Sequence, residues 1–195
     1  MKRKKRMKTR KLIIVGGANG VGKTTFAYQY SNEYGIDYLG ADAIAAGIDK
    51  KGSENIELMA GKLFFKKLDE YYTKNKSVII ESTLSGVGLA KRIEKFKENG
   101  FIIHLLFVFL DDVKLCKKRV AARVKKGGHD VPEEDIERRF FRSFINFKKI
   151  YLPVADTWQI VYNGLKRPVE IALGNKDFKT IIDEGYYKTF MEIAG

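Results

Sequence analysis

Apolar runs of strand length alternate with longer amphipathic segments along most of the chain. A short uninterrupted apolar run bounded by glycine or polar residues is typical of a buried parallel strand. Apolar residues spaced three and four apart are typical of a helix that covers such a sheet. The pattern predicts strands at residues 12–15, 36–39, 77–81, 101–110 and 158–162, with 101–110 as the central strand.

Helices are predicted between these strands. A first helix is expected to run to Tyr30, and others at residues 53–74, 87–99, 112–126, 131–151 and 177–193. Asp111 is the expected N-cap of the helix that ends near residue 126. Asp130 and Glu133 resemble a capping box, with Pro132 in the first turn of the next helix.

The order of these elements predicts the fold class. Asn163-Gly164 is a tight-turn signal before a return strand at residues 169–173. Strands separated by helices predict a parallel α/β sheet with helices on both faces, here followed by a C-terminal hairpin and helix.

The stretch after the first strand fits the P-loop pattern G-x-x-x-x-G-K-[ST]. In such a loop the backbone N–H groups point at phosphate oxygens, and the following helix directs its positive end at the same anion. Lys23 is expected to reach the β- and γ-phosphates of ATP, and the Thr24 hydroxyl to bind Mg²⁺. The expected nucleotide-binding residues are Gly17, Ala18, Asn19, Gly20, Val21, Gly22, Lys23, Thr24 and Thr25.

Two carboxylates follow neighbouring predicted strands. Asp42 comes after the second strand and Glu81 ends the third. Open α/β sheets bind ligands beyond the carboxyl ends of their strands, so both residues are expected to face the P-loop. Asp42 is the better candidate for the base that accepts the proton of an acceptor hydroxyl, and its alternative role is to cap a helix over residues 43–46. Glu81 could contact the acceptor or, through water, the metal, and its alternative role is a strand-end carboxylate bonded to backbone.

Cations are dense between residues 117 and 142. Arg119 and Arg123 share a helix face, and Arg138 and Arg139 lie beyond the Gly127-Gly128 break. Mobile arginine-bearing segments that close over ATP are recurrent in phosphoryl transfer, and the double glycine offers a hinge. The alternative is an exposed basic face paired with nearby acidic residues.

Composition limits the domain organisation. A chain of 195 residues, 45% of them hydrophobic, supports one core with a small lid. The single cysteine, Cys116, excludes an internal disulfide, fits a reducing cytoplasm and is expected to be a buried, inert thiol. No apolar run approaches the length of a membrane span. We therefore expect a cytoplasmic protein, with one domain at residues 12–195.

Much of the net charge of +13 is at the N-terminus, because residues 2–11 contain eight lysines and arginines. We interpret residues 1–11 as a flexible, solvated arm. The alternative is an arm that binds nucleic acid or anionic lipid, which would make the protein a nucleic-acid-associated ATPase.

Four segments together carry a family resemblance. GGANGVGKTT, GADAIAAG, IIESTLSG and RVAARVKKGGHDVPEEDIERRF resemble the zeta-toxin-like kinases, in particular the compact bacterial branch named as predicted ABC-type ATPases. The resemblance covers about residues 12–163. Its most branch-specific part is GGHDVPEEDI.

The resemblance implies a nucleotide-kinase-like fold and a kinase that uses ATP and Mg²⁺. Zeta toxins phosphorylate a sugar hydroxyl of UDP-N-acetylglucosamine, and an antitoxin partner blocks their ATP site. By this resemblance Asp42 takes the place of the catalytic base, Glu81 and Thr83 match the acceptor-binding E-x-T motif, and Arg123 matches a lid arginine.

The chain departs from the toxins in its lid, expected at about residues 123–139. Where the toxins carry a second lid arginine, this chain has Gly128-His129. The candidate substitutes are His129, Arg138 and Arg139, beside Arg119 on the preceding helix. The leading function is thus an ATP-dependent small-molecule kinase. A nucleotide-binding module without catalysis is a further alternative, and Asp111, which ends an apolar run, is a minor candidate for a metal ligand.

Overall fold

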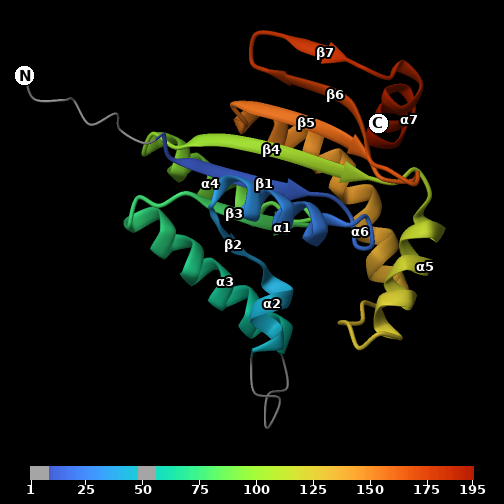
Figure 1. The fold of residues 1–195 in the computed structure, drawn as a ribbon, viewed down its shortest axis with the longest axis horizontal. Coiled ribbons are helices and arrows are strands. Elements are labelled where there is room, and N and C mark those ends of the chain that lie inside the picture. The colour runs from blue at the N-terminus through green and yellow to red at the C-terminus, as the bar shows by residue number, and fades with distance from the viewer. Residues whose placement is uncertain (1–8, 48–55) are drawn as a thin grey trace, which may run out of the picture.

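One sheet of seven strands runs through the protein in the order β2-β3-β1-β4-β5-β6-β7 (Figure 1). The structure is a computed structural model that describes residues 9–47 and 56–195, apart from four side chains, those of Asp42, Ala46, Ile56 and Glu57. The first five strands in this order are parallel to one another. β6 is antiparallel to β5, and β7 is antiparallel to β6. The strands are β1 (Lys11–Gly16), β2 (Asp37–Leu39), β3 (Val78–Ser82), β4 (Ile102–Phe109), β5 (Thr157–Tyr162), β6 (Val169–Asn175) and β7 (Lys179–Ile181). The predicted parallel sheet is confirmed, with β4 at its centre.

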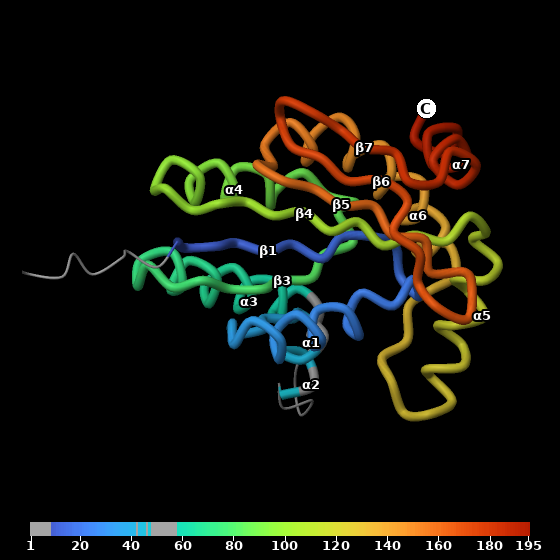
Figure 2. The backbone as a smooth tube through the Cα atoms, turned by 45° about the horizontal axis from the view of Figure 1, so that its top comes forward, coloured from blue at the N-terminus to red at the C-terminus, as the bar shows by residue number. Residues whose placement is uncertain are grey.

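Helices lie on both faces of the sheet, as predicted. Figures 1 and 2 show α1 on one face and α4 and α6 on the other. The helices are α1 (Lys23–Tyr34), α2 (Ala41–Ala46), α3 (Ile56–Thr73), α4 (Gly88–Glu98), α5 (Val113–Val124), α6 (Glu133–Asn146) and α7 (Glu184–Ala194). A π-helical turn (Phe147–Tyr151) and a 3₁₀ turn (Leu152–Val154) follow α6. Among the described helices, none combines the length and apolar character needed to cross a bilayer.

An aromatic cluster ties β4 to the helices behind it. Phe107 and Phe109 of β4 each contact Phe190 of α7 and Phe144 of α6, with ring centroids between 5.3 and 5.7 Å apart. Such edge-to-face packing adds to the stability given by apolar burial. The cluster holds the C-terminal helix on the same core as the central strand.

The predicted C-terminal helix at residues 177–193 is wrong in its first half. The Asn175 side chain accepts hydrogen bonds from the backbone N–H groups of Asp177 and Phe178, at 2.8 and 3.0 Å, and so closes a turn. The chain then returns as β7, which pairs with β6. The helix begins only after Asp183, whose carboxylate accepts from the Tyr186 N–H at 3.0 Å.

Two predicted helix caps are also wrong. The N-cap of α5 is Asp112, which accepts from the Lys114 N–H at 2.7 Å, and not Asp111. The expected capping box before α6 does not form, because Asp130 accepts from the N–H of its neighbour Val131 and Pro132 occupies the N-cap. At α5 the path of the strand-to-helix loop decides which of the two carboxylates reaches the free N–H groups, whereas at α6 no side chain caps the helix.

Parts of the predicted N-terminal arm and of the helix at 53–74 lie outside the described residues. These parts are residues 1–8 and 53–55. Within the described part of the arm, Lys11 already belongs to β1, and Arg10 donates to the carbonyl of Asn99 at 2.9 Å and lies over the Phe101 ring.

Cys116 lies fully buried in α5, as the sequence predicts. Burial raises the pKa of its thiol to about 12. Because the thiolate is the reactive species, we expect native protein at pH 8 to react with a thiol reagent at least about a hundredfold more slowly than protein unfolded in guanidinium. Equal rates in the two states would contradict the buried position of Cys116, and Cys116→Ser supplies the blank.

Candidate active site

A cleft of about 460 Å³ opens at the carboxyl ends of β1 and β3. The P-loop forms its floor, α2 and α3 lie on one side, and α5 and α6 on the other (Figure 1). It is lined by Asn19, Gly20, Gly22, Lys23, Thr24, Thr25, Ala41, Gly61, Phe64, Phe65, Glu81, Ser82, Thr83, Arg119, Val120, Arg123 and Arg139. Most of the side chains singled out in the sequence therefore meet in one place.

The P-loop backbone lies directly against its neighbours. A Cβ atom at Gly17, which has φ +136°, would come within 2.1 Å of the Val108 carbonyl oxygen on β4. A Cβ atom at Gly20, with φ +82°, would come within 2.5 Å of the Cys116 carbonyl oxygen on α5. Both positions need glycine for two reasons, the positive φ and the close backbone approach. These contacts hold the loop between the central strand and α5.

Two hydrogen bonds orient the polar side chains at the start of α1. The Lys23 ammonium group donates to the Ala18 carbonyl at 2.8 Å. The Thr24 hydroxyl donates to a carboxylate oxygen of Glu81 at 2.9 Å. Glu81 lies opposite Val15 in the β1–β3 register and is only 9% exposed. Its hydrogen bond is to this side chain, whereas the alternative prediction paired it with backbone.

The Thr24 and Glu81 oxygens are of the type that Mg²⁺ prefers. Among the side chains that the structure describes, which exclude that of Asp42, no cluster of three or more His, Cys, Asp or Glu could hold a metal. A site with one hydroxyl and one carboxylate fits a cation that keeps its waters and binds substrate phosphates.

Asp42 is the second residue of α2, and its side chain lies outside the description. The N-cap of α2 is Gly40, so the alternative role of Asp42 as a helix cap is wrong. Ala41, immediately before it, lines the cleft.

The loop after β3 holds Thr83 in a defined position. The Thr83 and Ser85 hydroxyls are 2.8 Å apart and share a hydrogen bond. Leu84 between them is fully buried and has φ +56°, an uncommon conformation for a residue with a side chain. The Asn146 amide of α6 donates to the Leu84 carbonyl at 2.8 Å, and the Tyr151 hydroxyl donates to the Gly86 carbonyl. The surrounding structure thus maintains a strained backbone beside the cleft.

The five lid cations separate into two groups. Arg119, Arg123 and Arg139 line the cleft, and Arg138 and His129 are not among its lining residues. Arg123 donates to the His129 carbonyl at 2.8 Å. Arg138 and Arg139 both pair with Asp135, at 2.6 and 3.0 Å, yet only Arg139 reaches the cleft. Adjacent positions on a helix differ in direction by about 100°, which explains the difference.

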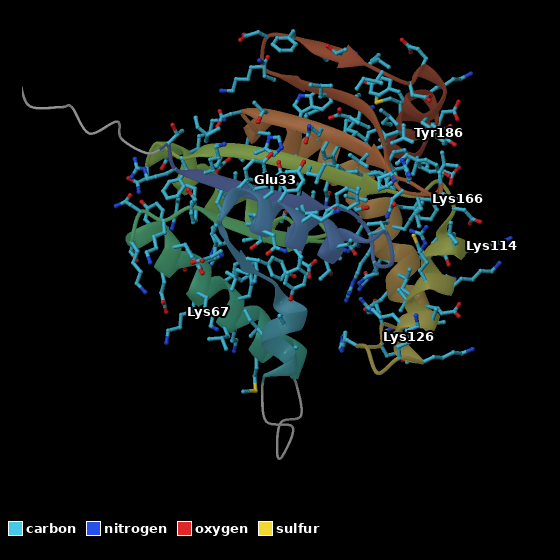
Figure 3. All side chains as sticks on the ribbon, in the orientation of Figure 1. Glu33, Lys67, Lys114, Lys126, Lys166 and Tyr186 are labelled. Atoms are coloured by element: carbon cyan, nitrogen blue, oxygen red, sulfur yellow. The ribbon has the colours of Figure 1, made fainter. Side chains whose placement is uncertain are left out.

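Lysine side chains project outward on both sides of the cleft. Figure 3 shows Lys114 projecting from α5 and Lys126 from the turn after it, with Lys166 beyond β5 on the same side. Lys67 projects from α3 on the opposite side. The arginines that line the cleft therefore belong to the side that also carries the lysines of α5.

Asn163 supports the P-loop, although the sequence pattern indicated it only as part of a turn. Its side-chain amide donates to the Val21 carbonyl of the P-loop at 2.8 Å. Its own carbonyl accepts from Arg119 at 2.9 Å, and its N–H donates to the Phe109 carbonyl. Asn163 thus connects the P-loop, the end of β4 and α5. Its place after the apolar run of β5 is the signal that could have indicated it, since strand ends meet at the cleft.

The α3 wall was also missed. Gly61, Phe64 and Phe65 line the cleft on the side opposite the arginines. Within the described part of the chain, and apart from the adjacent residues and backbone of α3 itself, no atom lies within 4 Å of a Cβ built at Gly61. Glycine inside a helix destabilises it by about 1 kcal/mol relative to alanine, and packing gives no reason for it here. The signal was this glycine within an otherwise regular amphipathic segment.

Asp111 has a structural partner. It accepts a hydrogen bond from the Tyr162 hydroxyl at 3.0 Å. Burial, and then the Asp111 carboxylate, raise the pKa of Tyr162. Tyr162 stacks on Tyr186 of α7 with centroids 4.1 Å apart. Asp111 is not among the lining residues of the cleft.

The chain also matches a family of known domains. A family model described as an AAA domain, AAA_33, matches residues 12–143. The chain belongs to this AAA domain family. An uncharacterized protein of Haemophilus influenzae is 32% identical to this AAA domain chain over 133 residues, covering 67% of the chain and 92% of that protein. The cytidylate kinase of Saccharolobus islandicus is 29% identical over 149 residues, covering 72% of the chain and 73% of that enzyme.

Solved structures share the fold at lower sequence identity. A chain of the PezAT chromosomal toxin-antitoxin system of Streptococcus pneumoniae superimposes with a TM-score of 0.66 at 18% identity, covering 99% of this chain and 81% of that one. A chain of the AvrRxo1-ORF1:AvrRxo1-ORF2 complex with ATP gives a TM-score of 0.73 at 15% identity, covering 96% and 64%. The AAA domain chain therefore has a P-loop kinase-like fold.

Loss of the Asn163 side chain is expected to weaken ATP binding. Asn163→Ala removes the donor to the Val21 carbonyl and frees the P-loop backbone, at a cost of roughly 1 kcal/mol, or about fivefold in the Kd for ATP. Asn99→Ala is the matched control, because Asn99 bonds to Asn75 at the other end of the sheet. Isothermal titration calorimetry with ATP and Mg²⁺ measures both. An unchanged Kd for Asn163→Ala would show that the P-loop keeps its shape without this bond.

Proposed function

We propose that the protein transfers the γ-phosphate of ATP to a hydroxyl group of a small molecule, as zeta-toxin-type kinases do. The observation that carries the proposal is the convergence in one cleft of the P-loop, Glu81 and three arginines. Phosphoryl transfer depends mainly on positioning and on neutralising charge on the phosphates, and these groups supply both. The likeness to a cytidylate kinase and to a chain solved with ATP supports a nucleotide-using phosphotransferase.

The P-loop is the proposed site of the ATP phosphates. Lys23 would move from the Ala18 carbonyl to the β- and γ-phosphates, and the backbone N–H groups would donate to their oxygens. Thr24 would bind Mg²⁺, which neutralises phosphate charge when bound. The Thr24 hydroxyl, now donating to Glu81, would then turn an oxygen lone pair to the ion.

Asp42 is the proposed base. It would accept the proton of the acceptor hydroxyl as that oxygen attacks the γ-phosphorus. Its support is its place at the carboxyl end of β2, next to a residue that lines the cleft. Glu81 and Thr83 are the proposed acceptor contacts at the end of β3.

Arg139 is the proposed second lid cation, acting with Arg123 and Arg119 on the phosphates. The choice among the three candidate substitutes rests on the lining of the cleft, which includes Arg139 and neither Arg138 nor His129. Arginine donors aimed at the transferring group stabilise the charge that it carries in the transition state.

UDP-N-acetylglucosamine is the acceptor we test first, because of the zeta-toxin resemblance. Purified protein with ATP, Mg²⁺ and this sugar nucleotide is analysed by mass spectrometry. A phosphorylated sugar nucleotide, absent with Lys23→Ala, is the expected result. Release of ADP without this product would support the kinase assignment and reject UDP-N-acetylglucosamine as the acceptor.

Because the PezAT structure is of a toxin-antitoxin system, we also propose an antitoxin-type protein as a partner.

Lys23→Ala and Asp42→Asn are both expected to reduce phosphoryl transfer at least about a hundredfold. They should differ in binding, since Asp42→Asn leaves the P-loop intact and should keep the Kd for ATP within a few-fold. Steady-state turnover and calorimetry separate the two effects. Wild-type turnover by Asp42→Asn would reject the base assignment.

Arg139→Ala is expected to lower kcat by about ten- to a hundredfold, through loss of one charged donor to the phosphates. Arg138→Ala is a matched control, because it also loses an ion pair with Asp135 but faces away from the cleft lining. Its kcat should stay within about twofold of wild type. The same loss in both variants would assign the effect to Asp135 and the helix rather than to the cleft.

A further inference from the structure

The two sides of the cleft differ in chemistry. The α5–α6 side supplies Arg119, Arg123 and Arg139, which suit phosphates. The α3 side supplies Gly61, Phe64 and Phe65, which offer no charge. The proposed contacts to the ATP phosphates use only the floor of the cleft and the α5–α6 side. The apolar side is therefore unexplained by ATP phosphates.

Gly61 and Phe65 lie on one face of α3, since they are four residues apart, and both line the cleft. No atom of the Phe65 ring lies within 4 Å of a Cβ built at Gly61. Since a Cβ at Gly61 would have no described atom within 4 Å, the space beside this ring is open.

Arg92 supports the Phe65 ring from outside the cleft lining. Its guanidinium lies 4.0 Å from the ring centroid, and its Nε is 3.3 Å from the Asp69 carboxylate. Phe64 packs against the same ring with centroids 5.4 Å apart. A cation on the ring and an edge-to-face neighbour restrict its orientation. The wall is thus pre-organised, which reduces the entropy lost when a ligand packs on it.

We propose that Gly61 and Phe65 are the residues that select the acceptor, by packing a planar ring of it against the Phe65 ring in the space left by the glycine. The inference rests on the proposed function, since it assigns the α3 side to the acceptor. An acceptor of this class carries a heteroaromatic base beside its hydroxyl and phosphate groups, and the base stacks on an aromatic side chain. A side chain at position 61 would occupy the place of the base. Arg92 acts through Phe65 and is a positioning residue.

The test compares ligands that differ only in the ring. Wild-type protein is saturated with a non-hydrolysable ATP analogue and Mg²⁺, and calorimetry gives the Kd for each of the four ribonucleoside 5′-monophosphates and for ribose 5-phosphate. At least one nucleotide is expected to bind about tenfold or more tightly than ribose 5-phosphate. If none does, the stacking surface is rejected. Because only binding is measured, this result is independent of whether the protein transfers phosphate.

Variants then locate the ring. Gly61→Leu is expected to raise the Kd of the preferred nucleotide at least about tenfold, while the Kd values for ribose 5-phosphate and for the ATP analogue stay within about twofold. Gly88→Leu is the matched control. A Cβ at Gly88 also meets no described neighbour within 4 Å, but Gly88 is the first residue of α4 and does not line the cleft. Phe65→Leu is the second variant and should remove most of the preference for the nucleotide over ribose 5-phosphate. Unchanged nucleotide binding in Gly61→Leu and Phe65→Leu would overturn the proposal.

Discussion

The architecture of the cleft depends on how closely the P-loop backbone approaches its surroundings. At Gly17 the loop touches a carbonyl of β4, and at Gly20 it touches a carbonyl of α5, with no room for a side chain at either place. The side-chain amide of Asn163 donates to the carbonyl of Val21, the residue after Gly20. A phosphate-binding loop must present several N–H groups in one direction, and these three contacts maintain that shape before any anion is bound.

The parallel sheet brings the other parts of the cleft to this loop. The register between β1 and β3 sets Glu81 beside Val15, two residues before the loop, and the Thr24 hydroxyl reaches the Glu81 carboxylate. Parallel strands present their carboxyl ends on one edge, so residues far apart in the chain meet there. The result is a cleft with a polar floor, a cationic side from α5 and α6 and an apolar side from α3. A charged phosphate donor could occupy the cationic side while an acceptor of different chemistry occupies the apolar side.

Most of the fold was predictable because its signals are local. β1, β3 and β4 are largely buried, and each is mainly an apolar run in the sequence. β7 was not predictable in this way, since it has three residues at the edge of the sheet and depends on a turn closed by Asn175. The caps of α5 and α6 failed for a related reason. Asp111 and Asp112 are equally good capping residues, and only the path of the loop decides that Asp112 caps the helix while Asp111 meets Tyr162.

The sequence by itself determined the P-loop, the parallel sheet around it and the presence of carboxylates at the ends of β2 and β3. These features follow from spacing within one segment or from the alternation of segments, which the chain carries without reference to tertiary contacts. Only the tertiary structure decided that Arg139 rather than Arg138 lines the cleft, that Asn163 supports the P-loop, and that Gly61 opens a wall beside Phe65. Each of these depends on the direction of a side chain relative to an element distant in the sequence, and that direction is set by packing.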